Sequence, residues 1–288
     1  MKTIEFDKEF FNIADTLSCG QVFRFTPYKS GFLIFSEDKC AYAYQTEDKT
    51  IVLCSDTDRD YFYNYFDLSA DYKSIYEAAI SQREEKLITA AKLGKGIRIL
   101  NQNPTETLFS FIISQNNNIP RIKGIIERLA IRLGEKKKFD GVIYYSFPSA
   151  QKMAQMPEEF FKEIGLGYRA PYIKKLAEDI VSGFDVSALK TLSTLELKKR
   201  LLNIYGVGPK VCDCVSFFGF HKTDSFPVDT WIEKVYIEDF NGTLKNREKI
   251  AEYFVNRFKE NSGYFQQYLF YYKRSIEKTL ESDKSNAK

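Results

Sequence analysis

The sequence contains a single histidine, His221, and its five cysteines form no cluster with the spacing of metal ligands. One histidine excludes a multi-histidine metal site and argues against a Ser-His-Asp triad. Because the number of cysteines is odd and the chain is not short, we expect free thiols in a reducing compartment rather than a disulfide framework. Without a four-cysteine motif, the sequence predicts no iron–sulfur or zinc centre, and we expect neither a metal nor a cofactor.

Long apolar runs are also missing. No stretch approaches the ~20 apolar residues that cross a membrane, and the acidic start of the chain does not resemble a signal peptide. The net charge is only +3 over 288 residues. This small excess does not identify a nucleic-acid-binding protein, so local clusters would have to supply the electrostatics. Hydrophobic residues make up 44% of the chain and aromatic residues 16%, which is enough for a substantial core.

The pattern of apolar residues divides the chain into two parts. The first third contains short β-rich segments separated by polar breaks, which predict an antiparallel sheet; they are residues 20–25, 31–35, 41–44 and 50–54. Helical spacing begins near residue 60 and continues almost to residue 282, with a capping box at Ser193 and Glu196. The sequence predicts an α+β protein, with an N-terminal antiparallel β-sheet domain and flanking helices in residues 1–95 and a mostly α-helical domain in residues 96–288.

Residues 197–220 are typical of two helices joined by a tight glycine turn. Gly206 and Gly208 permit positive φ and a close approach of the backbone. The free amides at the start of the second helix favour an anion, and a DNA phosphate would fit there without any reading of sequence. An ordinary helical corner would contain the same glycines, so the turn alone does not decide between the two interpretations.

Lys210 lies in the first turn of the second helix, where the helix dipole disfavours a cation and so favours the neutral amine. A neutral amine is the nucleophile that forms a Schiff base, although a solvated surface lysine explains the residue equally well. Asp229 follows nineteen residues later, just before another predicted helix. We expect one of its oxygens to cap that helix and the other to stabilise positive charge on a sugar; a plain N-cap is the alternative.

The sequence resembles the helix-hairpin-helix DNA glycosylase superfamily, and within it the 8-oxoguanine DNA glycosylases. Four blocks in matching order carry the resemblance: residues 18–25 (SCGQVFRF), 108–122 (LFSFIISQNNNIPRI), 165–170 (GLGYRA) and 206–229. The resemblance implies a DNA glycosylase and AP lyase of base excision repair, in which Lys210 attacks C1′ of the sugar and expels the damaged base. Asp229 would be its carboxylate partner. Such an enzyme must first take the nucleotide out of the duplex.

The same resemblance assigns the residues that read the damaged base. Oxidation at C8 of guanine makes N7 a donor, and the backbone carbonyl of Gly20 would accept from it. Gln266 would read the Watson–Crick edge, while Phe270 and Cys214 would cover the two faces of the base. From the residues alone, Gly20 is equally compatible with a simple turn, and Cys214 and Phe270 with the core. The pattern also leaves Gln266 and its neighbour Gln267 ambiguous by one position.

A further set would face the opposite strand. Asn116, the first of three consecutive asparagines, would fill the hole left by the base, and Tyr168 would act as a stacking wedge. Arg121 and Arg169 would hold the unpaired cytosine; without the resemblance, both would be interpreted as exposed or phosphate-pairing arginines. Trp231 departs from the family, since animal members have a histidine there near the phosphate backbone, and that contact stays open.

The sequence therefore predicts a bifunctional glycosylase and lyase that removes 8-oxoguanine from double-stranded DNA, preferably opposite cytosine. We expect a monomer, located in the cytoplasm and associated with the nucleoid in a bacterium or archaeon, or in the nucleus of a eukaryote. Two alternatives stay open. One is a non-catalytic helix-hairpin-helix DNA-binding protein, against which the placement of Lys210 and Asp229 argues. The other is a glycosylase for a different oxidised purine.

Overall fold

A computed structural model of the chain describes the backbone of residues 1–286 and the side chains of residues 1–276. Five antiparallel strands form one sheet in the order β1-β5-β4-β3-β2. The strands are β1 (Lys2–Asp7), β2 (Phe25–Tyr28), β3 (Gly31–Ser36), β4 (Lys39–Gln45) and β5 (Lys49–Cys54). Consecutive hairpins join β2 to β5, whereas β1 pairs at the far edge, with Ile4 opposite Val52. The predicted antiparallel sheet is confirmed.

Two details of the predicted sheet are wrong. Strand β1 was not expected from the sequence, and the segment 20–25 is a strand only from Phe25 onward. The cause is tertiary, because this segment joins the sheet to the helices. Gln21 is buried and its Nε2 donates to the carbonyl of Arg98 at 2.8 Å, while Phe23 packs against Phe111 with ring centroids 5.6 Å apart.

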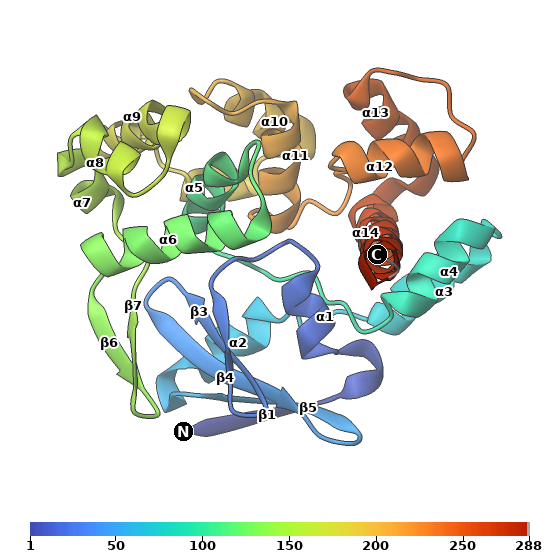
Figure 1. The fold of residues 1–288 in the computed structure, drawn as a ribbon, viewed down its shortest axis with the longest axis horizontal. Coiled ribbons are helices and arrows are strands. Elements are labelled where there is room, and N and C mark those ends of the chain that lie inside the picture. The colour runs from blue at the N-terminus through green and yellow to red at the C-terminus, as the bar shows by residue number, and fades with distance from the viewer. Residues whose placement is uncertain (287–288) are drawn as a thin grey trace.

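The rest of the chain is mainly helical, as predicted. The helices are α1 (Ile13–Ser18), α2 (Arg59–Tyr65), α3 (Tyr72–Ser81), α4 (Glu85–Leu93), α5 (Pro104–Ser114), α6 (Ile119–Leu133), α7 (Ala150–Gln155), α8 (Glu158–Glu163), α9 (Ala170–Val181), α10 (Thr194–Leu202), α11 (Pro209–Phe218), α12 (Thr230–Lys234), α13 (Arg247–Phe258) and α14 (Ser262–Asn286). Figure 1 shows the sheet with α1 and α2 in the lower half and most of the helices above it. The capping box of Ser193 and Glu196 at the start of α10 is confirmed.

Helix α5 forms the centre of the main core. Every residue from Thr107 to Ser114 is buried, so this part of the helix is covered on all sides and presents no stripe to solvent. Phe111 stacks on Phe218 of α11 with ring centroids 5.5 Å apart. Because α5 contacts both α11 and the segment before β2, it fixes the position of the glycine hairpin relative to the sheet.

A short hairpin of β6 (Lys136–Phe139) and β7 (Val142–Tyr145) interrupts the helices, where helix was expected from the sequence. Asp140 and Gly141 form its turn, both with positive φ (46° and 82°), which suits the tight turns of β-hairpins. The hairpin lies against the sheet (Figure 1), where Tyr144 stacks on Phe35 at 5.3 Å. The run of three lysines hid the strand pattern in the sequence.

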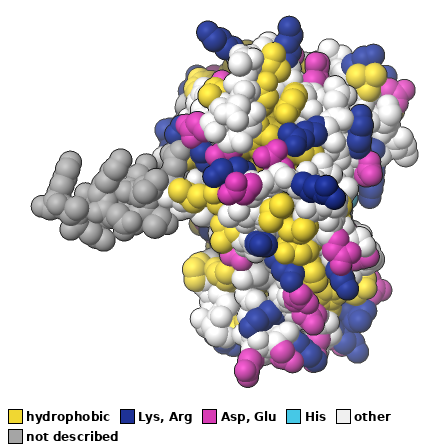
Figure 2. All heavy atoms as spheres, turned by 90° about the vertical axis from the view of Figure 1, so that its right-hand side faces the viewer, with side chains coloured by type: hydrophobic (Ala, Val, Ile, Leu, Met, Phe, Trp, Pro, Cys, Tyr) yellow, Lys and Arg dark blue, Asp and Glu magenta, His cyan; other side chains and the backbone are white. Residues whose placement is uncertain are grey.

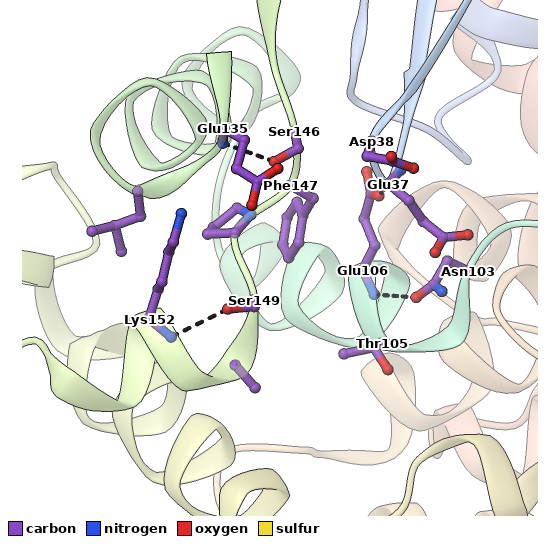
Figure 3. Close-up of a pocket in the computed structure, with 13 residues that line it drawn as sticks. Glu37, Asp38, Asn103, Thr105, Glu106, Glu135, Ser146, Phe147, Ser149 and Lys152 are labelled. Atoms are coloured by element: carbon purple, nitrogen blue, oxygen red, sulfur yellow. Dashed lines mark hydrogen bonds between the residues drawn. The ribbon is translucent and has the colours of Figure 1, made fainter. Parts of the chain in front are cut away.

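The junction between the sheet and the helices contains a pocket of about 350 Å³, lined by carboxylates from the β3–β4 turn and from α5 (Figure 3). Its carboxylate Glu106 is held from two sides: Arg24 donates to it at 3.2 Å and the backbone N–H of Glu37 at 2.7 Å. Burial raises the pKa of Glu106, and the charge of Arg24 opposes this rise. These bonds tie the β3–β4 turn to the start of α5.

Candidate active site

The glycine turn between α10 and α11 is built as the sequence predicted. Gly206 has φ +87°, and a Cβ there would lie 2.3 Å from Cγ of Tyr172, so only glycine fits. Gly208 is the N-cap of α11, and a Cβ added to it would meet open space. The carbonyl of Gly206 accepts a hydrogen bond from Nε2 of Gln115 at 2.9 Å. This bond ties the turn to the end of α5.

Lys210 is the second residue of α11, directly after Pro209. Its side chain lines a hollow of about 50 Å³ together with other predicted residues, namely Gly20, Cys214, Asp229, Gln266 and Phe270. The amine lies 5.5 Å from the centroid of the Phe111 ring. The structure therefore brings six of the predicted residues to one place.

Asp229 is the N-cap of α12, as the sequence predicted. Its Oδ1 accepts from the backbone N–H groups of Trp231 at 2.9 Å and Ile232 at 3.0 Å. Burial raises the pKa of the Asp229 carboxyl, while the two backbone hydrogen bonds and the charge of Lys210 oppose the rise. Both capping bonds go to Oδ1, and Asp229 also lines the hollow that contains Lys210.

The floor of the hollow comes from the loop before β2 and from α14. Gly20 has φ +89°, and a Cβ there would lie 3.2 Å from Cε1 of Phe270. Gln266 is buried; its Nε2 donates to the carbonyl of Pro227 at 3.1 Å, and its Oε1 has no partner among the described residues. Gln267 instead donates to the carbonyl of Cys19 at 2.7 Å. Both glutamines line the hollow, and of the two only Gln266 has a buried side-chain oxygen without a partner among the described residues.

Cys214 lies one helical turn after Lys210 on α11 and is buried. Burial raises the pKa of its thiol to about 11, and the charge of Lys210 opposes the rise. All five cysteines are free and buried. A thiol in this state is neutral and apolar at physiological pH, so it offers a flat contact surface rather than a nucleophile.

The residues predicted to face the opposite strand lie together beside the glycine turn. Asn116 has φ +45°, and its Nδ2 donates to the hydroxyl of Tyr168 at 3.2 Å. The Tyr168 side chain is 50% exposed. Arg121 is also exposed, and its Nη2 donates to the carbonyl of Gly165 at 3.4 Å.

Arg169 differs from the other predicted residues, because its guanidinium is buried. Its Nε donates to the carbonyl of Gln115 at 2.8 Å and its Nη2 to the carbonyl of Asn116 at 3.0 Å. Its Cζ also lies 4.4 Å from the centroid of the Tyr168 ring. In this conformation Arg169 holds in place the loop of residues 115–118 between α5 and α6, here called the asparagine loop.

Several residues of the site were missed from the sequence. Phe111 lines the hollow, and Gln115 connects α5 to the glycine turn. Arg274 of α14 lies over Phe270, with its Cζ 5.4 Å from the ring centroid, and donates to the carbonyl of Ser18. The spacing of four between Phe270 and Arg274 could have indicated a shared helix face.

Among the described residues, no group of three or more His, Cys, Asp or Glu side chains is arranged to hold a metal ion. No helix in the same part of the chain is both long and apolar enough to cross a membrane.

Comparison with known families now places the chain. Residues 109–260 match the family described as HhH-GPD superfamily base excision DNA repair protein, and the chain belongs to this superfamily. Residues 3–108 match the family described as 8-oxoguanine DNA glycosylase, N-terminal domain. The predicted resemblance and the predicted fold class are both confirmed by these two matches.

Individual relatives agree with this placement. The N-glycosylase/DNA lyase of Saccharomyces cerevisiae is 30% identical over 258 residues, covering 79% of this chain and 68% of the yeast protein. N-glycosylase/DNA lyase OGG1 of Arabidopsis thaliana is 32% identical over 215 residues, covering 69% of this chain and 58% of the plant protein. A structure of Clostridium acetobutylicum 8-oxoguanine glycosylase/lyase, bound to double-stranded DNA with cytosine opposite 8-oxoG, has a TM-score of 0.89 and 32% identity over 95% of this chain and 98% of that one.

The two glycines of the turn give a matched test of its geometry. Gly206→Ala should destabilise the fold by at least about 2 kcal/mol, because alanine is strained at positive φ and its Cβ would overlap the Tyr172 ring. Gly208→Ala should cost less than about 1 kcal/mol, since its Cβ would meet open space. Urea unfolding of both variants measures the difference. Equal stability of the two variants would contradict the described turn.

Proposed function

We propose that this protein is a bifunctional DNA glycosylase and AP lyase that excises 8-oxoguanine from duplex DNA, preferably opposite cytosine, in base excision repair. The observation that carries the proposal is that Lys210 and Asp229 line one hollow, each at the start of a helix. Yeast and plant relatives named N-glycosylase/DNA lyase support it. A structural relative bound to DNA with cytosine opposite 8-oxoG supports the choice of lesion.

The amine of Lys210 provides the nucleophile. Its neutral form attacks C1′ of the extruded nucleotide, the C1′–N9 bond breaks, and the base leaves with the bonding electrons and takes up a proton. Opening of the sugar ring gives a Schiff base between the amine and C1′. Loss of a C2′ proton then expels the 3′ phosphate by β-elimination, and water hydrolyses the imine to return free Lys210.

Asp229 acts electrostatically in this scheme. Positive charge develops on the sugar as the base leaves, and a carboxylate oxygen facing the hollow stabilises it. The capping bonds to α12 fix the carboxylate, so it need not reorganise during the reaction.

Recognition of the base depends on the floor of the hollow. The N7–H of 8-oxoguanine would donate to the Gly20 carbonyl, whereas N7 of guanine would leave that acceptor facing another acceptor. The unpaired Oε1 of Gln266 would accept from the donors of the Watson–Crick edge. Phe270 and Cys214 would enclose the base. A wrong base would leave a buried polar atom without a hydrogen-bond partner. Its binding is strongly disfavoured, because the cost of desolvating that atom is not compensated.

On the opposite strand, Asn116 and Tyr168 would occupy the space left by the base, and Arg121 with Arg169 would bind the unpaired cytosine. For Arg169 this requires its guanidinium to turn away from the carbonyls of Gln115 and Asn116. We further propose that residues 1–95 and 96–288 act as two domains of a monomer. The expected location is the cytoplasm of a bacterium or archaeon, or the nucleus of a eukaryote.

A glycosylase for another oxidised purine would use the same amine and carboxylate, and a non-catalytic DNA-binding protein would need neither. Comparing excision of several lesions from one duplex sequence separates the first alternative. A wild-type protein that binds duplex DNA but releases no base would establish the second.

Removing the amine tests its role in the chemistry. Lys210→Gln should lower base release in single-turnover assays by at least ~10³-fold, because no other group replaces the nucleophile. Duplex binding should survive. Lys92→Gln, which changes an exposed lysine on α4, is the matched control and should leave the rate unchanged. Undiminished activity of Lys210→Gln would overturn the assignment.

The carboxylate gives a prediction for pH dependence. Burial raises the pKa of Asp229, and the reaction needs its charged form. Activity should therefore be lost, as pH falls, at a higher pH than for an exposed aspartate. Single-turnover rates of base release measured against pH locate this limb. Asp229→Asn should be slow at every pH and should lack the limb; a limb that persists unchanged in this variant belongs to another group.

Selection of the opposite base should depend on the arginines. Arg121→Ala should reduce the preference for cytosine over other opposite bases by about tenfold, because the guanidinium offers a fork of donors to cytosine. Arg169→Ala should loosen the preference too, and should also lower the melting temperature, since it holds the loop carbonyls. The measurement is the ratio of excision rates for matched duplexes. Ratios equal to those of wild type would exclude this role for both arginines.

A further inference from the structure

Tyr205 lies in the glycine turn itself, two residues after Asn203, the C-cap of α10, and is 57% exposed. A single exposed tyrosine is ordinary on a protein surface. Tyr205 differs because its ring is held in one orientation. It packs against Tyr172 of α9 edge to face, with centroids 4.9 Å apart and an interplanar angle of 88°.

The neighbouring glycine explains how Tyr172 reaches this position. A Cβ at Gly206 would overlap the Tyr172 side chain at three atoms, all within 2.7 Å. The missing side chain therefore makes room for the ring that supports Tyr205. Gly206 therefore does two things: it adopts the positive φ of the turn, and it lets α9 and the turn approach each other closely.

The Tyr172 ring also contacts a second tyrosine besides Tyr205. Tyr172 meets Tyr168 edge to face, with centroids 6.1 Å apart and an angle of 80°. Tyr168 accepts a hydrogen bond from Asn116. Tyr205, Tyr172 and Tyr168 thus form one line of three rings, here called the tyrosine row. It runs from the glycine turn to the asparagine loop, and both of its end rings are at least half exposed.

The charge around Tyr205 suits an anionic polymer. From Lys198 to Lys210 the sequence contains four cationic residues and no acidic one, and of these Lys198 pairs with Asp213 of α11 at 2.7 Å. Figure 2 shows the side of the molecule that lies on the right in Figure 1. On this side, cationic and acidic side chains are interspersed. Nucleic-acid-binding surfaces combine cationic side chains, which contact phosphates, with exposed aromatic rings, which offer an apolar face to the nucleotides.

We propose that Tyr205 is a DNA-binding residue, positioned by Tyr172, whose ring packs on a deoxyribose of the duplex backbone next to the phosphate that the amides of the glycine turn would bind. This rests on the proposed function, because it takes duplex DNA as the partner. The contact is made by the ring and not by its hydroxyl. It would add a third point of attachment to the two predicted from the sequence, the amides of the turn and the asparagine loop.

The test measures affinity for an undamaged duplex, so that it does not depend on catalysis. Tyr205→Ala should weaken binding about five- to tenfold, the lower end of what aromatic contacts to bases contribute. Tyr205→Phe should bind within about twofold of wild type, because it keeps the ring. The slope of log Kd against log salt should not change in Tyr205→Ala, since no phosphate charge is uncovered.

Tyr63→Ala is the matched control, because Tyr63 is a 38% exposed tyrosine on α2, near the sheet; it should bind as wild type does. Equal affinity of Tyr205→Ala and Tyr63→Ala would overturn the proposal, and so would a loss in Tyr205→Phe as large as in Tyr205→Ala. A reduced salt slope in Tyr205→Ala would also overturn it, by showing that displaced cations cause the loss. Failure of the proposed function appears separately, as wild-type protein that binds duplex DNA without releasing 8-oxoguanine.

Discussion

The capping of α12 by Asp229 is the constraint on which the candidate site depends. Two backbone N–H groups hold the Asp229 carboxylate at the hollow, and these bonds offset part of the cost of burying it. Lys210 approaches the same hollow from the first turn of α11. The first turns of two helices therefore place an amine and a carboxylate in one small space. The surrounding fold holds these two helices in position.

Helix α5 and the loop before β2 keep that arrangement rigid. The buried α5 supports α11 through the Phe111–Phe218 stack, and Gln115 at its end holds the turn through Gly206. The loop before β2 brings Gly20 to the floor of the hollow from the sheet side. The site is thus assembled from both parts of the chain, which explains why no single segment of the sequence defines it. In the same way, the tyrosine row connects two loops that are far apart in sequence.

The features that were predicted correctly from the sequence are those that residues close together in the chain determine. The strands β3 to β5, the capping box of α10, the glycine turn and the cap at Asp229 all follow from alternation, capping or backbone freedom. The segment 20–25, the lysine-rich hairpin and the inward guanidinium of Arg169 did not follow, because long-range contacts decide them. Gln266 and Phe270 were reached only through resemblance to a family, and both line the hollow. Their roles toward a base stay predictions.

The most direct measurement locates the covalent bond. Wild-type protein is mixed with an 8-oxoguanine duplex and borohydride, the reduced adduct is digested, and mass spectrometry identifies the modified peptide. The account predicts one adduct, on the side chain at position 210. An adduct on a different lysine or on the N-terminal amine would contradict it, and so would base release without any adduct.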